Sequence, residues 1–181
     1  MGFKIETENR GKFLLIGASV LMWLMLAFLF VTASAGGPRL WRNNGNGTFD
    51  DVTEKAGLMS LHPTQTATAT DYDNDGFLDI AVSGYDHGWN PSLRIFHNNG
   101  NGTFSSGIAP WGTSGPGAGG VAWGDFNGDG LLDLIASGYD YSWDERFRLY
   151  FNTGGGTFAT AVDLAPVWDM AGRSVSVVDF D

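Results

Sequence analysis

The sequence repeats itself with a period of 54 residues, and this repetition limits the possible folds more than any other feature. An acidic stretch of nine residues that begins at Asp71 recurs at Asp125. A second block, rich in Asn and Gly, occupies residues 98–104 and 152–158, with an earlier copy at 43–49. Such repetition indicates an array of similar units, each of which buries its apolar face against the next unit.

Each period is predicted to consist of short β-strands, because its apolar residues alternate with polar ones or are β-branched. The predicted strands are 66–70, 78–82 and 93–96 in one period, and 121–123, 132–136 and 147–150 in the next. With the strand that begins at Thr103 or Thr157, each period supplies about four strands. A four-stranded unit of this length cannot bury its apolar face alone, and radial packing solves this. The sequence therefore predicts an all-β fold, a β-propeller of four-stranded antiparallel blades, with about two to three blades present.

The acidic stretch predicts a calcium-binding loop. Oxygen-bearing side chains recur at alternate positions, and Gly76 or Gly130 allows a sharp bend. The predicted ligands are Asp71, Asp73, Asp75, the Phe77 carbonyl and Asp79 in the first loop, and Asp125, Asn127, Asp129, the Leu131 carbonyl and Asp133 in the second. Calcium accepts about 6 to 8 oxygen ligands in flexible geometry, whereas magnesium demands a stricter octahedron. Transition metals would lack their preferred His or Cys ligands in these loops.

The acidic loops have two other interpretations, a tight turn without metal and an EF-hand. Asp, Asn and Gly form tight turns without any metal, so turn chemistry alone is an alternative. However, the four carboxylates of the loop that begins at Asp71 would repel one another without a cation. An EF-hand is excluded, because its loop closes with a bidentate Glu at the twelfth position, where this chain has Val82 or Ala136.

The acidic loop, the strands around it and the Asn/Gly-rich turn before Thr-Phe resemble FG-GAP/VCBS-type repeats. Such repeats are similar to those of the integrin α-subunit propeller and of many bacterial surface proteins. The resemblance covers residues 40–181 and implies a propeller of about seven blades, with calcium between the first two strands of a blade. By position, it also implies that Asp179 and Asp181 begin a third calcium loop. The Phe-Gly and Gly-Ala-Pro signatures are not intact, so the bacterial VCBS variety is the nearer match.

The N-terminus differs from the repeats. Residues 13–31 carry no charge and follow three basic residues, and the small residues 33–35 come after them. This order predicts a secretory signal peptide cleaved before Gly36. An uncleaved hydrophobic helix is the alternative, because this stretch approaches the ~20 residues that span a bilayer. Both interpretations place the rest of the chain outside the cytoplasm, since basic residues favour the cytoplasmic side.

The predicted domains are the signal peptide or anchor, residues 1–35, and a partial propeller, residues 36–181. The repeats lie near 36–62, 63–115 and 116–169, with a truncated one at 170–181. Propellers close with about 4 to 8 blades, more than this length supplies at the observed period. We therefore expect the chain to be the N-terminal fragment of a longer protein, and closure by oligomerisation is the alternative.

Aromatic residues recur at two further places in the period. The loop after the second strand carries Tyr85, Asp86 and Trp89 in one period and Tyr139, Asp140 and Trp143 in the next. Aromatic and acidic groups in a surface loop can bind sugars, and packing of the rings against the neighbouring blade is the alternative. The ring after the first acidic-loop position is predicted to be a wedge in the core; these rings are Tyr72, Phe126 and Phe180.

Composition narrows the function. Acidic residues outnumber basic ones by 20 to 10, and no basic run is present, which argues against a nucleic-acid partner. The three histidines, His62, His87 and His97, occupy different repeat positions, and no nucleophile elbow or phosphate-binding loop is present, so we expect no enzyme activity. The expected function is an exported, calcium-binding module for adhesion or interaction with an extracellular protein or glycan. Membrane contact is expected only through an uncleaved N-terminal segment. The alternatives are an accessory domain of a secreted enzyme and a lectin-like propeller.

Overall fold

The computed structural model describes residues 28–31, 37–58, 63–105, 109, 116–164 and 174–177. The hydrophobic stretch before Phe28, the predicted cleavage site and the predicted ligands Asp179 and Asp181 lie outside the described residues, as does Phe180. Within the described part of the chain, no helix is long and apolar enough to cross a membrane.

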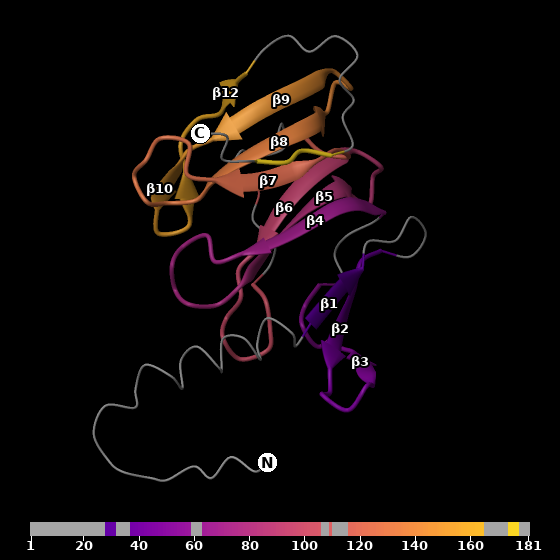
Figure 1. Ribbon diagram of the computed structural model, residues 1–181. Coiled ribbons are helices and arrows are strands. Elements are labelled where there is room, and N and C mark those ends of the chain that lie inside the picture. The colour runs from indigo at the N-terminus through magenta and orange to yellow at the C-terminus, as the bar shows by residue number, and fades with distance from the viewer. Residues whose placement is uncertain are drawn as a thin grey trace, which may run out of the picture.

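All of the described secondary structure is β-structure in antiparallel sheets (Figure 1). The strands are β1 (Phe28–Val31), β2 (Arg39–Asn43), β3 (Phe49–Asp51), β4 (Thr64–Thr70), β5 (Asp79–Tyr85), β6 (Pro91–Phe96), β7 (Val121–Gly124), β8 (Asp133–Tyr139), β9 (Glu145–Tyr150), β10 (Asn152–Gly154), β11 (Thr157–Phe158) and β12 (Val162–Asp163). They form sheets in the orders β1-β2-β3, β4-β5-β6 and β12-β9-β8-β7, with a separate β10-β11 hairpin. The predicted all-β fold with blade-like antiparallel sheets is confirmed.

The second and third of these sheets are copies in the same register. Ile80 of β5 pairs with Phe96 of β6, and one period later Leu134 of β8 pairs with Tyr150 of β9. The central strands β5 and β8 are buried at their first six positions, which explains why they read as continuous apolar runs instead of alternating ones. Each central strand starts at the last residue of an acidic loop, so the sheet fixes the position of the end of that loop.

The apolar core between these two sheets is centred on Tyr72. Only 2 % of Tyr72 is exposed. Its ring stacks on Trp123 and on Phe158, with centroid distances of 5.9 Å in both pairs. Leu93 and Leu134 belong to the same buried cluster. The prediction that Tyr72 is a core wedge is confirmed, and the wedge sits beside the first acidic loop.

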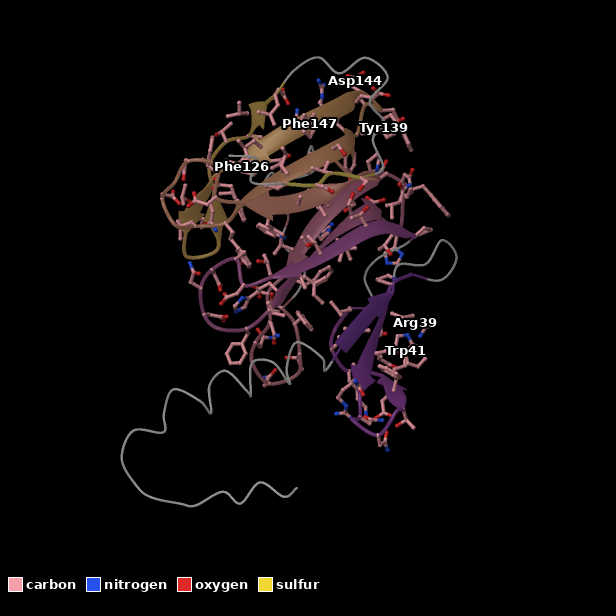
Figure 2. The ribbon with its side chains drawn as sticks, viewed as in Figure 1. Arg39, Trp41, Phe126, Tyr139, Asp144 and Phe147 are labelled. Atoms are coloured by element: carbon pink, nitrogen blue, oxygen red, sulfur yellow. The ribbon has the colours of Figure 1, made fainter. Side chains whose placement is uncertain are left out.

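Phe126, one period after Tyr72, is not a core residue, and this prediction is wrong. Its side chain is 40 % exposed, and Figure 2 shows it at the edge of the β7-β8-β9-β12 sheet. The physical reason lies in the residue that should cover it. Tyr72 is covered by both Trp123 and Phe158 of the next repeat, whereas the structure describes only one equivalent position beside Phe126, the smaller and exposed Val177.

The last four residues of the predicted N-terminal hydrophobic helix form strand β1 instead, so the prediction of a helix is wrong for these residues. Leu29 pairs with Trp41 of β2, which is the register of Ile80 with Phe96 in the next repeat. β1 therefore takes the place of β5 in the first repeat, and its Phe and Val residues favour a strand. Cleavage before Gly36 would remove β1 and leave this edge of β2 unpaired.

Candidate metal-binding loops

Each acidic loop folds around its first carboxylate. Asp71 Oδ1 accepts the Asp75 N–H at 3.0 Å, and Asp71 Oδ2 accepts the Gly76 N–H at 2.9 Å. Asp125 makes the same two contacts one period later, at 3.1 and 2.9 Å. The two loops therefore share the same hydrogen bonds around the first carboxylate, although their sequences differ at several positions.

Residues in left-handed conformations produce the sharp turn that the sequence predicts. Gly76 has a φ of 92° and Gly130 a φ of 84°, a region that favours glycine because it lacks a Cβ atom. Two positions earlier, Asn74 and Gly128 also have positive φ, at 61° and 76°. Asn tolerates this region better than most residues, so both loops can turn twice.

The ninth carboxylate of each loop is buried and ties the loop to another segment. Asp79 is 1 % exposed and Asp133 is fully buried. The Asn98 N–H donates to Asp79 Oδ1 at 2.7 Å, and the Tyr72 N–H donates to Asp79 Oδ2 at 3.3 Å. Asp133 accepts the equivalent bonds at 2.8 and 3.0 Å. The ninth position is thus part of the scaffold as well as a predicted ligand.

Burial raises the pKa of Asp79 to about 6. The hydrogen bonds from the Asn98 and Tyr72 backbone lower this pKa, whereas the nearby charge of Asp73 raises it further. A buried carboxylate beside another carboxylate pays a desolvation cost when it is charged. A cation bound between them would favour the charged form, so the electrostatics of the first loop fit a bound cation.

Asn98 and Asn152 support the loops, a role that the sequence pattern did not predict. The Asn98 Nδ2 donates to the Leu78 carbonyl at 3.0 Å, and the Asn152 Nδ2 donates to the Leu132 carbonyl at 3.1 Å. Asn152 also donates to the Tyr72 carbonyl at 2.7 Å, which links consecutive repeats. Both residues could have been found from the sequence, because each lies 19 residues after the ninth carboxylate of its loop, Asp79 or Asp133.

The structure brings together all four side chains predicted as ligands in the first loop. Ligand oxygens of Asp71, Asp73 and Asp79 lie within 4.8 Å of one another, and Asp73 and Asp75 belong to a second, overlapping group. Asp73 Oδ1 is buried and has no hydrogen-bond partner in the described part of the chain. A buried, unpaired carboxylate oxygen facing other carboxylates fits a divalent cation.

His97 completes that second group, although the sequence predicted no His or Cys ligand for these loops. His97 Nδ1 lies 3.2 Å from Asp73 Oδ2 and 3.2 Å from Asp79 Oδ1, and His97 Nε2 lies 3.7 Å from Asp75 Oδ2. The acidic stretch itself contains no histidine. His97 comes from the end of β6, directly before Asn98, and only the fold carries it to the loop.

Among the described residues, the carboxylates of the second loop form no group as close as those of the first, and its predicted ligands are oxygens alone. Its third position is Asn127, whose Nδ2 donates to Asp129 Oδ2 at 2.8 Å. Phe151 occupies the place of His97 in the second repeat. The His97 carbonyl accepts the Ser105 N–H at 2.8 Å, and the Phe151 carbonyl accepts the Ala159 N–H at the same distance. The predicted contributions of the Phe77 and Leu131 carbonyls stay predictions for both loops.

The repeated aromatic loops lie at the other end of the blades. Figure 2 shows Tyr139 and Asp144 at one end of the β7-β8-β9-β12 sheet and Phe126 at the other. The same separation follows from β5 and β8, each of which runs from an acidic loop to the tyrosine of an aromatic loop. A seven-residue strand spans about 20 Å, so the two kinds of loop do not touch.

The four predicted aromatic residues form a row across two repeats. Ring centroids are 6.2 Å apart for Trp89 and Tyr85, 6.2 Å for Tyr85 and Trp143, and 6.0 Å for Trp143 and Tyr139. Trp143 therefore packs against the preceding repeat, yet it is 54 % exposed, and Trp89 is 59 % exposed. Both tryptophans have a φ of 63°, a strained conformation for a bulky residue.

The acidic residues of these loops are engaged within the loops. Asp86 Oδ1 accepts backbone N–H groups of Gly88 and Asn90, and Asp86 Oδ2 accepts the Tyr141 hydroxyl at 2.8 Å. Asp140 Oδ2 accepts the Arg146 Nε–H at 2.8 Å. Burial alone would raise the pKa of Asp140, but Arg146 and backbone donors hold it below the usual value. The rings of Trp89 and Trp143 are therefore the exposed part of the loops, whereas these two carboxylates are engaged within them.

The sequence matches the profile of a family described as an FG-GAP-like repeat, over residues 28–82 and again over 71–136. Together the two matches cover more than half of the chain, and the second contains both acidic loops. The first match begins at β1, which agrees with the place of β1 in a repeat. No curated protein matches the chain.

Proposed function

Because this chain belongs to the FG-GAP-like repeat family, we propose that it is a calcium-binding β-propeller module that mediates adhesion or interaction outside the cytoplasm. The observation that carries the proposal is the pair of acidic loops, which share one set of hydrogen bonds around Asp71 and Asp125. The partner would be an extracellular protein or a glycan, and the module would not itself be an enzyme.

Calcium suits these loops because of their ligand chemistry and their place in the fold. Carboxylate and amide oxygens are hard ligands, and a loop that gathers them without strict geometry favours Ca²⁺ over Mg²⁺. The ion would sit next to Asp79, whose partner Tyr72 packs against the next repeat. Calcium would therefore stabilise the joint between repeats as well as the loop.

Export is supported by the family and by the N-terminal sequence. FG-GAP-like repeats are typical of extracellular and cell-surface proteins. The uncharged residues 13–31 after a basic start would provide the means of export, as a cleaved signal or as an anchor, although the last four of them form strand β1. The acidic balance of the chain disfavours nucleic acid, and its contact with a membrane would be confined to that N-terminal segment.

Calcium is expected to raise the melting temperature of the protein, and Asp75→Ala or Asp129→Ala is expected to remove about half of that rise. A site at 100 times its Kd adds about 2.7 kcal/mol, and each variant disables one of two sites. The measurement is thermal unfolding in calcium and in chelator. Asp50→Ala is the matched control, because Asp50 is an exposed acid paired with Arg42 outside both loops. An unchanged difference between calcium and chelator in both loop variants would refute calcium binding.

Glycan binding is a second candidate function, favoured by the row of exposed rings. Backbone strain tends to persist where function requires it, and both tryptophans keep a positive φ that Gly or Asn would adopt at lower cost. Sugars stack on exposed aromatic faces, and the polar groups around Asp86 and Tyr141 suit hydroxyl groups better than an apolar partner. Under this second candidate function, the extracellular partner of the proposed module is a glycan.

Trp89→Gly and Trp143→Gly together are expected to weaken glycan binding at least about tenfold, because each lost stacking contact costs around 1 kcal/mol. Glycine relieves the strained φ, so these variants should keep the wild-type melting temperature. The measurement is binding to a glycan array followed by titration of the strongest glycan. Phe49→Gly, at another exposed ring, is the control. Full binding by the double variant would eliminate the lectin interpretation.

A further inference from the structure

The two acidic loops differ in one neighbouring residue that changes their metal chemistry. His97 lies against the first loop, whereas Phe151 occupies the same backbone position beside the second. The remaining frame is shared, since the ninth carboxylates Asp79 and Asp133 accept the same two backbone bonds. The fold therefore does not need a histidine at this place in order to form the loop.

The distances around His97 are those of ligands that share one ion. Two ligand atoms about 2.1 Å from a metal, at angles between square and tetrahedral, lie about 3.0–3.4 Å apart. His97 Nδ1 lies 3.2 Å from oxygens of both Asp73 and Asp79. The ligand atoms of His97, Asp73 and Asp75 also fall within 4.8 Å of one another.

Unpaired polar atoms provide a separate indication. His97 Nδ1 and Asp73 Oδ1 are both buried, and neither has a hydrogen-bond partner among the residues that the structure describes. The short distances from Nδ1 to the carboxylates thus lack the geometry of a hydrogen bond. His97 Nδ1 is within ion-pair distance of two carboxylates but makes no hydrogen bond to them, and Asp73 Oδ1 makes none either, an arrangement that fits a cation held between these groups.

We propose that the first loop, through His97, accepts a divalent transition-metal ion of the Zn²⁺ type at a mixed nitrogen and oxygen site in addition to Ca²⁺, whereas the second loop accepts only oxygen-seeking ions such as Ca²⁺. Imidazole nitrogen is a preferred ligand of zinc and its neighbours, and Ca²⁺ binds through oxygen. The proposal rests on the proposed function insofar as both treat the acidic loops as metal sites. It adds that the two sites differ in selectivity.

The test uses the full-length chain with one loop disabled at a time. Asp129→Ala leaves the first loop intact, and Asp75→Ala leaves the second. Each protein is titrated calorimetrically with zinc chloride and, separately, with calcium chloride. We expect zinc to bind the Asp129→Ala protein at least about tenfold more tightly than the Asp75→Ala protein, since loss of one good ligand costs at least that factor.

His97→Phe in the Asp129→Ala background isolates the histidine, because it copies the residue that the second loop already carries. Zinc affinity should fall at least about tenfold, and calcium affinity should change by less than about threefold. A measurement on the unaltered protein guards against misfolding of the variant. Zinc should shift the imidazole ¹⁵N resonances of His97 and leave those of His87 in place.

Unchanged zinc affinity in His97→Phe, together with unshifted His97 resonances, would overturn the proposal, and His97 would then serve only as an ion-pair partner of the carboxylates. A failure of calcium binding by both loops, with zinc still bound through His97, would refute the calcium function and leave the zinc site standing. The two proposals therefore fail separately.

Discussion

Tyr72→Ala is expected to reduce the free energy of unfolding by about 3–5 kcal/mol, the usual cost of truncating a buried aromatic ring. The ring fills the space between two repeats, where Trp123 and Phe158 stack on it. Truncation would leave a cavity that the stiff flanking strands cannot close. Urea denaturation, followed by tryptophan fluorescence, measures the loss, and Trp123 should report it directly.

Phe49→Ala is the control for this change, because Phe49 is an aromatic residue of the first sheet that is largely exposed. It should cost less than about 1 kcal/mol. Equal losses for the two variants would mean that the repeats are not joined through Tyr72. Tyr72→Phe should retain most of the stability, since the packing of the ring is what matters.

Asp133→Ala is expected to destabilise the protein by about 2–5 kcal/mol even when a chelator removes all divalent ions. The fully buried carboxylate accepts the N–H groups of Phe126 and Asn152, at 3.0 and 2.8 Å. Alanine would leave two donors without partners, at about 1–3 kcal/mol each. Denaturation in chelator measures this scaffold role without any contribution from a bound ion.

Asp129→Ala is the matched comparison within the same loop. Asp129 is exposed, and among the described residues its carboxylate accepts hydrogen bonds from Leu131 and Asn127 of the same loop. In chelator it should cost less than about 1 kcal/mol, and its effect should emerge only in calcium. If Asp133→Ala were as stable as the wild type in chelator, the buried carboxylate would act solely as a ligand, and its scaffold role would be wrong.

The repeat period made the blades and the acidic loops predictable, because strand alternation and loop chemistry are local properties of the chain. Tyr72 could be placed in the core for the same reason. Phe126 could not, because the burial of such a ring depends on the residues that the next repeat supplies, as Trp123 and Phe158 do for Tyr72. Local pattern alone does not reveal whether a neighbour covers a given ring.

Other parts of the site were hidden because they depend on contacts between distant segments. His97 reaches the first loop only after β5 and β6 pair, so a search for ligands within the acidic stretch could not include it. Residues 28–31 belong to an apolar run that reads equally well as a helix, and only pairing with β2 identifies them as a strand.

The hydrogen bond from Asn152 to the Tyr72 carbonyl has a consequence for how such a gene can change in length. It joins one repeat to the preceding one by a head-to-tail contact, and a contact of that kind can be added or deleted without altering the others. Unequal recombination that gains or loses 54 codons would recreate the same joint. The first two Asn/Gly-rich blocks are 55 residues apart, and the additional residue falls within the connection 50–70, ahead of the acidic loop. The connections between the joints can thus vary in length. Because every joint is alike, the number of repeats can change during evolution.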